Sequence, residues 1–240
     1  MNLFITGTDT DVGKTIVTAG VAAVMQSLGY IIGVYKPVQS GSVKHKGFLI
    51  SPDLKFTKSI DPNIKTKCSY TLYHPVAPSL AAKVENVKIN TKAILNDYLS
   101  LKASCDIVLV EGAGGLMVPI CDNFLMADMA KMLQLPVVIV ARPDLGTINH
   151  TLLTINAAKH AGLRVIGVII NNYPVGTKDL AIKEAPAIIE ELSGVKILGI
   201  IPKLEIFNSS FNPESLLDAI INNVDLQKMF NIQIPKLSQL

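Results

Sequence analysis

Residues 7–15 have the composition and spacing of a loop that binds phosphate groups. They follow the apolar residues 3–5 and precede a segment with helical periodicity, so this loop joins a strand to a helix. Gly13 lets the backbone approach phosphate oxygens, Lys14 adds a positive charge at the start of the helix, and Thr15 offers a hydroxyl to Mg²⁺. Five residues separate Gly7 from Gly13 where the consensus has four, which predicts a longer variant of the loop. A plain glycine-rich turn is the alternative.

A lysine follows at a position that could complete such a site, and an aspartate follows at a predicted helix start. Lys36 leaves a predicted strand at residues 31–35, and open α/β sheets bind ligands where their strands end. Asp53 comes directly after Ser51 and Pro52, a pattern typical of a helix start. Considered alone, Lys36 is a solvated charge at a strand end and Asp53 is an acid in the first turn of a helix. Both alternatives stay open on these residues.

Glu111 lies where another predicted strand emerges from the core. Residues 107–110 are four consecutive β-favouring apolar residues, which indicates a strand buried on both faces. A carboxylate at the end of a strand near a phosphate loop is the usual place for an acid directed at Mg²⁺, although most such sites use Asp. Gly112 and Gly114 would let the next loop pass close to a ligand. The alternative is a glycine-rich turn with an exposed glutamate.

Two later loops offer neutral groups instead of charges. Asn171 and Asn172 follow a predicted strand at residues 165–170, and a primary amide there could donate to and accept from the edge of adenine. An asparagine at that point is also common in turns. The loop at residues 142–150 leads into a helix whose N-terminus could bind a carboxylate, although Asn149 could serve only as its cap.

The predicted elements alternate between strands and helices, which is typical of an α/β fold with a mostly parallel sheet. The further strands are predicted at residues 137–140 and 196–201, and the helices at residues 16–28, 91–102, 126–133, 183–192 and 213–221. Residues 43–105 give the weakest signal. We expect one domain over residues 1–240, with a loosely ordered tail at 226–240.

Composition excludes several classes of function. The formal charge of +3, from 22 basic and 19 acidic residues, is too small to indicate a nucleic-acid partner, and the apolar runs are too short to span a membrane. Cys68, Cys105 and Cys121 lack the spacing of metal ligands and fit a reducing cytoplasm. The strand near the N-terminus leaves no room for a secretion signal, so we expect a cytoplasmic protein.

Taken together, the motifs resemble those of the dethiobiotin synthetases, which close a cyclic urea on a diamine. The resemblance covers about residues 1–205 in the order of that family, and implies a single-domain P-loop NTPase fold with helices on both faces of the sheet. The segments that carry it are Gly7-Thr8-Asp9-Thr10-Asp11-Val12-Gly13-Lys14-Thr15, Tyr35-Lys36-Pro37-Val38-Gln39-Ser40-Gly41, Asp53, Val110-Glu111-Gly112-Ala113-Gly114-Gly115 and Gly146-Thr147-Ile148-Asn149-His150. In one departure, Asp11 stands where the family usually has Glu.

The resemblance implies a role for each matching residue. Lys36 and Lys14 would be catalytic, and Thr15, Asp53 and Glu111 would hold Mg²⁺. The implied ATP contacts are Asp11, Val12, Gly13, Lys14, Thr15, Ile16, Asp53, Glu111, Gly112, Ala113, Gly114, Asn171, Asn172, Pro202, Lys203 and Leu204. The implied substrate contacts are Thr10, Ser40, Gly146, Thr147, Ile148 and Asn149.

The implied substrates are 7,8-diaminononanoate, CO₂ or bicarbonate, and ATP, acted on by a homodimer with its active site near the interface. A nucleotide-switch ATPase of the partitioning or septum-positioning type is the main alternative on the same fold. Such proteins carry an additional lysine early in the phosphate loop, and none occurs between Gly7 and Gly13. An amidating synthetase is less compatible, because its glutamine-hydrolysing domain would not fit within 240 residues.

Overall fold

A computed structural model describes residues 1–205 and 211–233 of the chain. A seven-stranded sheet runs through its centre, and every recorded pairing within that sheet is parallel. In spatial order its strands are β11 (Ile197–Pro202), β10 (Val165–Tyr173), β9 (Val137–Ala141), β1 (Leu3–Gly7), β6 (Ile107–Gly115), β2 (Ile32–Gln39) and β5 (Lys65–Thr71). The phosphate loop therefore leaves the middle strand, β1, with β9 on one side and β6 on the other.

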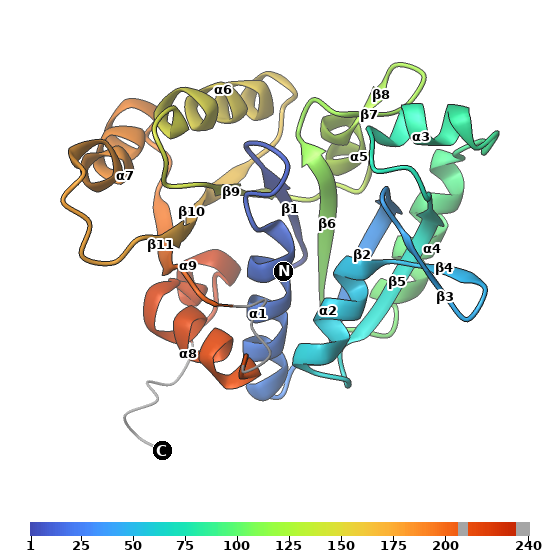
Figure 1. Cartoon of the computed structure of the whole chain (residues 1–240), viewed down its shortest axis with the longest axis horizontal. Coiled ribbons are helices and arrows are strands. Elements are labelled where there is room, and N and C mark those ends of the chain that lie inside the picture. The colour runs from blue at the N-terminus through green and yellow to red at the C-terminus, as the bar shows by residue number, and fades with distance from the viewer. Residues whose placement is uncertain (206–210, 234–240) are drawn as a thin grey trace.

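Helices cover both faces of this sheet, as the resemblance implied (Figure 1). One face packs against α1 (Lys14–Ser27), α2 (Pro52–Ile60), α8 (Pro213–Asn223) and α9 (Leu226–Phe230). The other packs against α3 (Pro78–Val84), α4 (Thr91–Lys102), α5 (Met126–Met132), α6 (Thr147–His160) and α7 (Leu180–Ser193). The two hydrophobic cores arise because side chains alternate along each strand: Leu3 and Ile5 face α1, whereas Phe4 faces the opposite layer.

The same alternation positions the charged residues of two neighbouring strands. Tyr35 in β2 is aligned with Val110 in β6, and both side chains belong to the core that contains α4. The next residues along each strand, Lys36 and Glu111, must therefore point to the opposite face, where α1 and α2 lie. The predicted strands ended near these residues, but β2 and β6 continue to Gln39 and Gly115.

Several elements differ from the sequence prediction. Residues 43–105 contain the edge strand β5 and a hairpin of β3 (Val43–His45) and β4 (Phe48–Ile50), none of which was predicted. A second short hairpin joins β7 (Pro119–Cys121) to β8 (Phe124–Leu125). Leu226, Met229 and Phe230 are buried in α9, so residues 226–230 are packed where a loose tail was expected; residues 234–240 of that tail lie outside the described part.

Within the described residues, no helix combines the length and the apolar character that crossing a membrane requires.

Candidate active site

The loop at residues 7–13 wraps around the side chain of the lysine that follows it. Gly13 has a φ of 92°, a left-handed conformation that favours glycine, and α1 begins directly after it. The buried Lys14 Nζ donates a hydrogen bond to the Asp9 carbonyl oxygen at 2.9 Å. A Cβ on Gly7 would lie 2.7 Å from that same oxygen, so the path of the loop requires glycine there too. The result is a concave backbone with an ammonium group at its base.

Lys36 is at the centre of a cluster of three buried or largely buried charges. Its Nζ lies 2.7 Å from Asp53 Oδ2 and 2.8 Å from Glu111 Oε1, and it also donates to the Gly112 carbonyl oxygen at 2.9 Å. The ammonium group has three N–H donors, and these three acceptors use all of them. The structure thus brings together the lysine and both acids that the sequence placed on separate segments.

Burial and pairing have opposite effects on the protonation of this cluster. Burial alone would lower the pKa of Lys36, but the carboxylates of Glu111 and Asp53 outweigh it and raise that pKa well above its ordinary value. Burial raises the pKa of Glu111, whereas the pKa of Asp53 is lowered because attraction to Lys36 outweighs its burial. No ion pair of Lys14 is present among the described residues, and burial and the nearby Lys36 charge lower its pKa to about 8.

The predicted metal ligands share this cluster. Thr15 Oγ1 donates to Glu111 Oε1 at 2.8 Å, while Glu111 Oε2 is buried and has no hydrogen-bond partner within the described part of the chain. Oxygen ligands of this kind suit a hard divalent cation such as Mg²⁺. In residues 1–205 and 211–233, no group of three or more His, Cys, Asp or Glu side chains could hold a metal ion. A cation here would therefore complete its coordination with Thr15, phosphate oxygens or water.

A serine holds Asp53 next to Lys36, and sequence reasoning assigned it no such role. Ser51 Oγ donates to Gln39 Oε1 at 2.5 Å and accepts from the Leu54 N–H at 3.1 Å, so one side chain caps α2 and ties it to the end of β2. The β3–β4 hairpin protrudes from the chain between Gln39 and Ser51. The available signal was the Ser-Pro-Asp helix start, but its partner on β2 is visible only in the folded chain.

The other side of the phosphate loop contacts an amide. Asn171, which is buried near the end of β10, donates through Nδ2 to the Val12 carbonyl oxygen at 3.1 Å. Asn172 is exposed, with a φ of 62°. The Lys203 N–H donates to the Tyr173 carbonyl oxygen at 2.9 Å, which joins the ends of β10 and β11. The asparagines and residues 202–204, predicted near adenine, thus lie on neighbouring strand ends.

The predicted substrate contacts are distributed over three segments. Gly146 has a φ of 95° and precedes α6, whose N-terminus has no side-chain cap. The Oγ1 of Thr147 and the Oγ of Ser40 are both buried, and neither has a hydrogen-bond partner among the described residues. Thr10 and Asn149 are exposed, and Ile148 is half-buried.

Arg142, which the sequence predictions do not include, also follows the end of a strand. Its Nη1 lies 3.8 Å from Asp9 Oδ2 in the phosphate loop, and its Nη2 lies 3.4 Å from His150 Nδ1 in α6. Arg142 therefore links the start of α6 to the phosphate loop. The rule that drew attention to Lys36, a charge at the carboxyl edge of the sheet, would also have found it.

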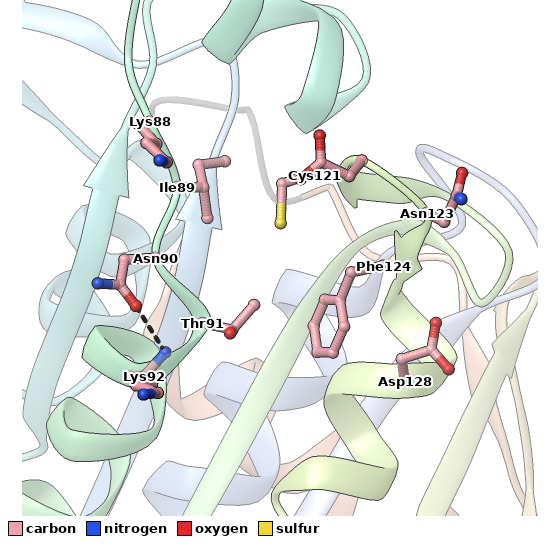
Figure 2. Close-up of a pocket in the computed structure, with 10 residues that line it drawn as sticks. Lys88, Ile89, Asn90, Thr91, Lys92, Cys121, Asn123, Phe124 and Asp128 are labelled. Atoms are coloured by element: carbon pink, nitrogen blue, oxygen red, sulfur yellow. Dashed lines mark hydrogen bonds between the residues drawn. The ribbon is translucent and has the colours of Figure 1, made fainter.

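A cavity of about 950 Å³ lies between the segment before α4 and the β7–β8 hairpin (Figure 2). Its walls are formed by Lys88, Ile89, Asn90, Thr91, Lys92, Cys121, Asp122, Asn123, Phe124 and Asp128. None of these is a predicted site residue, so the cavity is separate from the charged cluster in its lining.

Solved structures with a similar fold include the cell division protein MinD of Aquifex aeolicus. That chain is 15% identical, with a TM-score of 0.59 and 98% of both chains covered. The cell division ATPase MinD of Pyrococcus furiosus is 18% identical, with a TM-score of 0.56 and coverage of 91% of this chain and 89% of that one. At this identity the likeness shows the fold alone, a P-loop NTPase fold.

Sequence comparisons identify the family. Residues 1–210 match the family model described as an AAA domain. The protein named ATP-dependent dethiobiotin synthetase BioD of Bacillus cereus strain B4264 is 42% identical over 229 residues, which cover 94% of this chain and 92% of the relative. The protein of the same name from Bacillus thuringiensis strain Al Hakam is 41% identical over the same length and coverage. The chain therefore belongs to the ATP-dependent dethiobiotin synthetases, the ligases of biotin synthesis that this sequence resembles.

Proposed function

We propose that this enzyme uses ATP and Mg²⁺ to join CO₂ to 7,8-diaminononanoate and to close the resulting carbamate into the cyclic urea of dethiobiotin. One amine of the substrate adds to CO₂ and loses a proton, which gives a carbamate. A carbamate oxygen attacks the γ-phosphorus of ATP and releases ADP. The second amine then attacks the carbonyl carbon of this mixed anhydride, and phosphate leaves as the ring closes.

The observation that carries the proposal is the gathering of two buried lysines and two carboxylates at one edge of the sheet. The reaction brings a carbamate and a triphosphate, both anions, into contact, so it requires cations more than a protein nucleophile. Lys14 lies under the phosphate loop and Lys36 lies beside Glu111 and Asp53. In the proposed roles, Lys14 binds the β- and γ-phosphates and Lys36 holds the carbamate and the γ-phosphate oxygens.

The oxygen-rich surroundings of Glu111 support a Mg²⁺ site. Thr15, Asp53 and Glu111 would hold the ion, which when bound supplies positive charge to the phosphate oxygens. Among the described residues, the buried Oε2 of Glu111 has no hydrogen-bond partner. A bound cation would supply the partner that this oxygen lacks.

We propose that residues at the other strand ends contact adenine and the substrate carboxylate. Asn171, Asn172 and residues 202–204 would surround adenine, where an amide can both donate and accept. The uncapped start of α6 and the hydroxyl of Thr147 would bind the substrate carboxylate, because a helix N-terminus offers N–H donors and partial positive charge.

We also propose that the enzyme is a cytoplasmic homodimer with α6 at the interface. Light scattering on the active protein tests the dimer. A fully active monomer would contradict it.

The decisive experiment combines purified protein with diaminononanoate, bicarbonate, Mg²⁺ and ATP and follows the products by mass spectrometry. Formation of dethiobiotin together with ADP is the expected result. Hydrolysis of ATP without ring closure would contradict the proposal and favour a nucleotide switch. Omission of the diamine is the control, because a synthetase should then release little ADP.

A further inference from the structure

We infer that the Lys36 ammonium is a resident counter-ion that occupies the divalent-cation site of this enzyme until the cation arrives. The inference deepens the proposed function and rests on its Mg²⁺ site at Thr15, Asp53 and Glu111. In this view Lys36 and the divalent cation exclude each other from the same carboxylate oxygens. Arrival of the cation frees Lys36 for the reacting anions.

The Lys36 ammonium group has no N–H donor left for a further ligand. All three of its N–H donors are engaged, with Asp53 Oδ2 at 2.7 Å, Glu111 Oε1 at 2.8 Å and the Gly112 carbonyl oxygen at 2.9 Å. An ammonium group has no fourth donor. Lys36 therefore cannot hold a carbamate or a γ-phosphate oxygen without giving up one of these partners.

A divalent cation at this site would also bring charges of the same sign together. The two acids are the carboxylate ligands proposed for Mg²⁺, and a divalent ion bound to them would stand next to a buried ammonium group of the same sign. Two neighbouring positive charges repel each other strongly when both are buried, because the protein interior screens them less than water does. Thr15 is tied into the same arrangement, because its hydroxyl donates to the Glu111 oxygen that Lys36 also contacts. A cation that takes this oxygen would release both the hydroxyl and the ammonium group.

The Lys36 ammonium group would also reduce the repulsion between the carboxylates of Asp53 and Glu111. Two carboxylates in one buried site repel each other, and removal of a buried partner leaves an uncompensated charge. The Lys36 ammonium group offsets one of these two negative charges. Lys36 is therefore already next to the proposed position of the carbamate and the γ-phosphate.

Binding of Mn²⁺ without nucleotide tests the exchange, because free Mn²⁺ has an electron paramagnetic resonance signal that weakens on binding. We expect Lys36→Met to bind one Mn²⁺ at least about tenfold more tightly than the unchanged protein. The double variant Lys36→Met with Asp53→Asn should lose this gain. Lys67→Met is the matched control, since Lys67 forms a surface ion pair with Asp97 and its loss should leave Mn²⁺ binding unchanged.

Other results would overturn the inference. Equal Mn²⁺ affinity in Lys36→Met and the unchanged protein would mean that the ammonium group does not compete, and absence of binding by the variant would mean that the carboxylates do not gather a cation alone. Tight binding by the double variant would place the ion elsewhere. In each case dethiobiotin formation by the unchanged protein with Mg²⁺ and ATP would still support the proposed function.

A second measurement applies if Lys36→Met does not fold. A crystal structure of the unchanged protein with Mg²⁺ and a non-hydrolysable ATP analogue should show Lys36 Nζ more than about 4 Å from at least one of the two carboxylates, beyond ion-pair distance. A bound Mg²⁺ on Asp53 and Glu111 with Lys36 still at hydrogen-bond distance from both would refute the exchange.

Discussion

The two halves of the carboxyl edge of the sheet differ in the charge of the buried side chains that they bring together. On the side of β6 and β2, Lys36 is paired with Asp53, Glu111 and a carbonyl oxygen. On the side of β9 and β10, the start of α6 has no side-chain cap, and the hydroxyl of Thr147 has no partner in the described chain. An unpaired buried charge costs several kcal/mol, whereas an unsatisfied neutral group costs about 1–3 kcal/mol. Buried charges therefore need partners within the protein, whereas buried neutral groups can remain unpaired until a ligand binds.

The largest effect should come from Lys36→Met in the charged half. We expect dethiobiotin formation to fall at least about 10²- to 10³-fold, because the variant lacks the cation proposed to stabilise the transferring phosphoryl group. The free energy of unfolding should also fall, by about 3–5 kcal/mol, because two buried carboxylates lose their counter-ion. Steady-state kinetics and urea unfolding measure the two losses. With Lys67→Met as the control, near-normal turnover of Lys36→Met would remove this lysine from the mechanism.

A smaller effect is expected from Asn171→Ala in the neutral half. Asn171 holds the phosphate loop through the Val12 carbonyl and is proposed to contact adenine, so its loss should weaken ATP binding about tenfold. Turnover at saturating ATP should change little, because the amide is remote from the transferring phosphoryl group in the proposed mechanism. Calorimetry with a non-hydrolysable analogue tests this, with the surface residue Asn63→Ala as control. A large loss of turnover at saturating ATP would break the distinction between the two halves.

The pH dependence of nucleotide binding should come from Lys14. Its pKa is about 8 in the free protein, and bound phosphates should raise it by favouring the charged form. Between these two pKa values nucleotide binding takes up a proton, so affinity must fall as pH rises. We expect about a fivefold loss between pH 8 and pH 9. Lys14→Arg, which stays charged, should lack this slope, and an equal slope in both proteins would assign the titration to another group.

The smallest effect is expected for Thr147→Val, which exchanges an unpartnered hydroxyl for a methyl group. The free energy of unfolding should be unchanged or rise by up to about 1 kcal/mol, because no hydrogen bond within the described chain is lost. The KM for diaminononanoate should rise if the hydroxyl binds its carboxylate. Thr57→Val is the matched control: that buried hydroxyl donates to the Asp53 carbonyl, so its loss should destabilise the protein. Equal destabilisation by both would show that Thr147 is satisfied.

Much of the architecture was predictable, because buried parallel strands have uninterrupted apolar sequences. Residues 107–110 and 137–140 marked β6 and β9, and the helix predicted at residues 91–102 coincides with α4. The strand β5 was not predicted, because its seven residues include the polar residues Lys65, Lys67 and Ser69. Such residues are tolerated there because β5 lies at the edge of the sheet. Its side chains are only partly buried, so no apolar run marks it.

Individual residues of the candidate site could be proposed from the sequence, but the contacts between them could not. The rule that ligands bind at the carboxyl edge of the sheet singled out Lys36 and Glu111. Their contact depends on the β2–β6 alignment, which the sequence does not specify, and the approach of Asp53 depends on the bond between Ser51 and Gln39. These are tertiary contacts between segments that are individually unremarkable in sequence. The same rule would have singled out Arg142, but its contacts with Asp9 and His150 are likewise tertiary.

The bond between Ser51 and Gln39 has one more consequence. It closes the base of the excursion that contains β3 and β4, while Ser42 also anchors this base through its backbone bond to the Leu72 carbonyl. The tip of the hairpin is exposed, with Phe48 at its surface, so a change there should leave the position of Asp53 unaltered as long as the contacts at the base are kept. A chain with a longer, shorter or different hairpin tip should therefore keep the geometry of the charged cluster, provided that the hydrogen bond between Ser51 and Gln39 is retained.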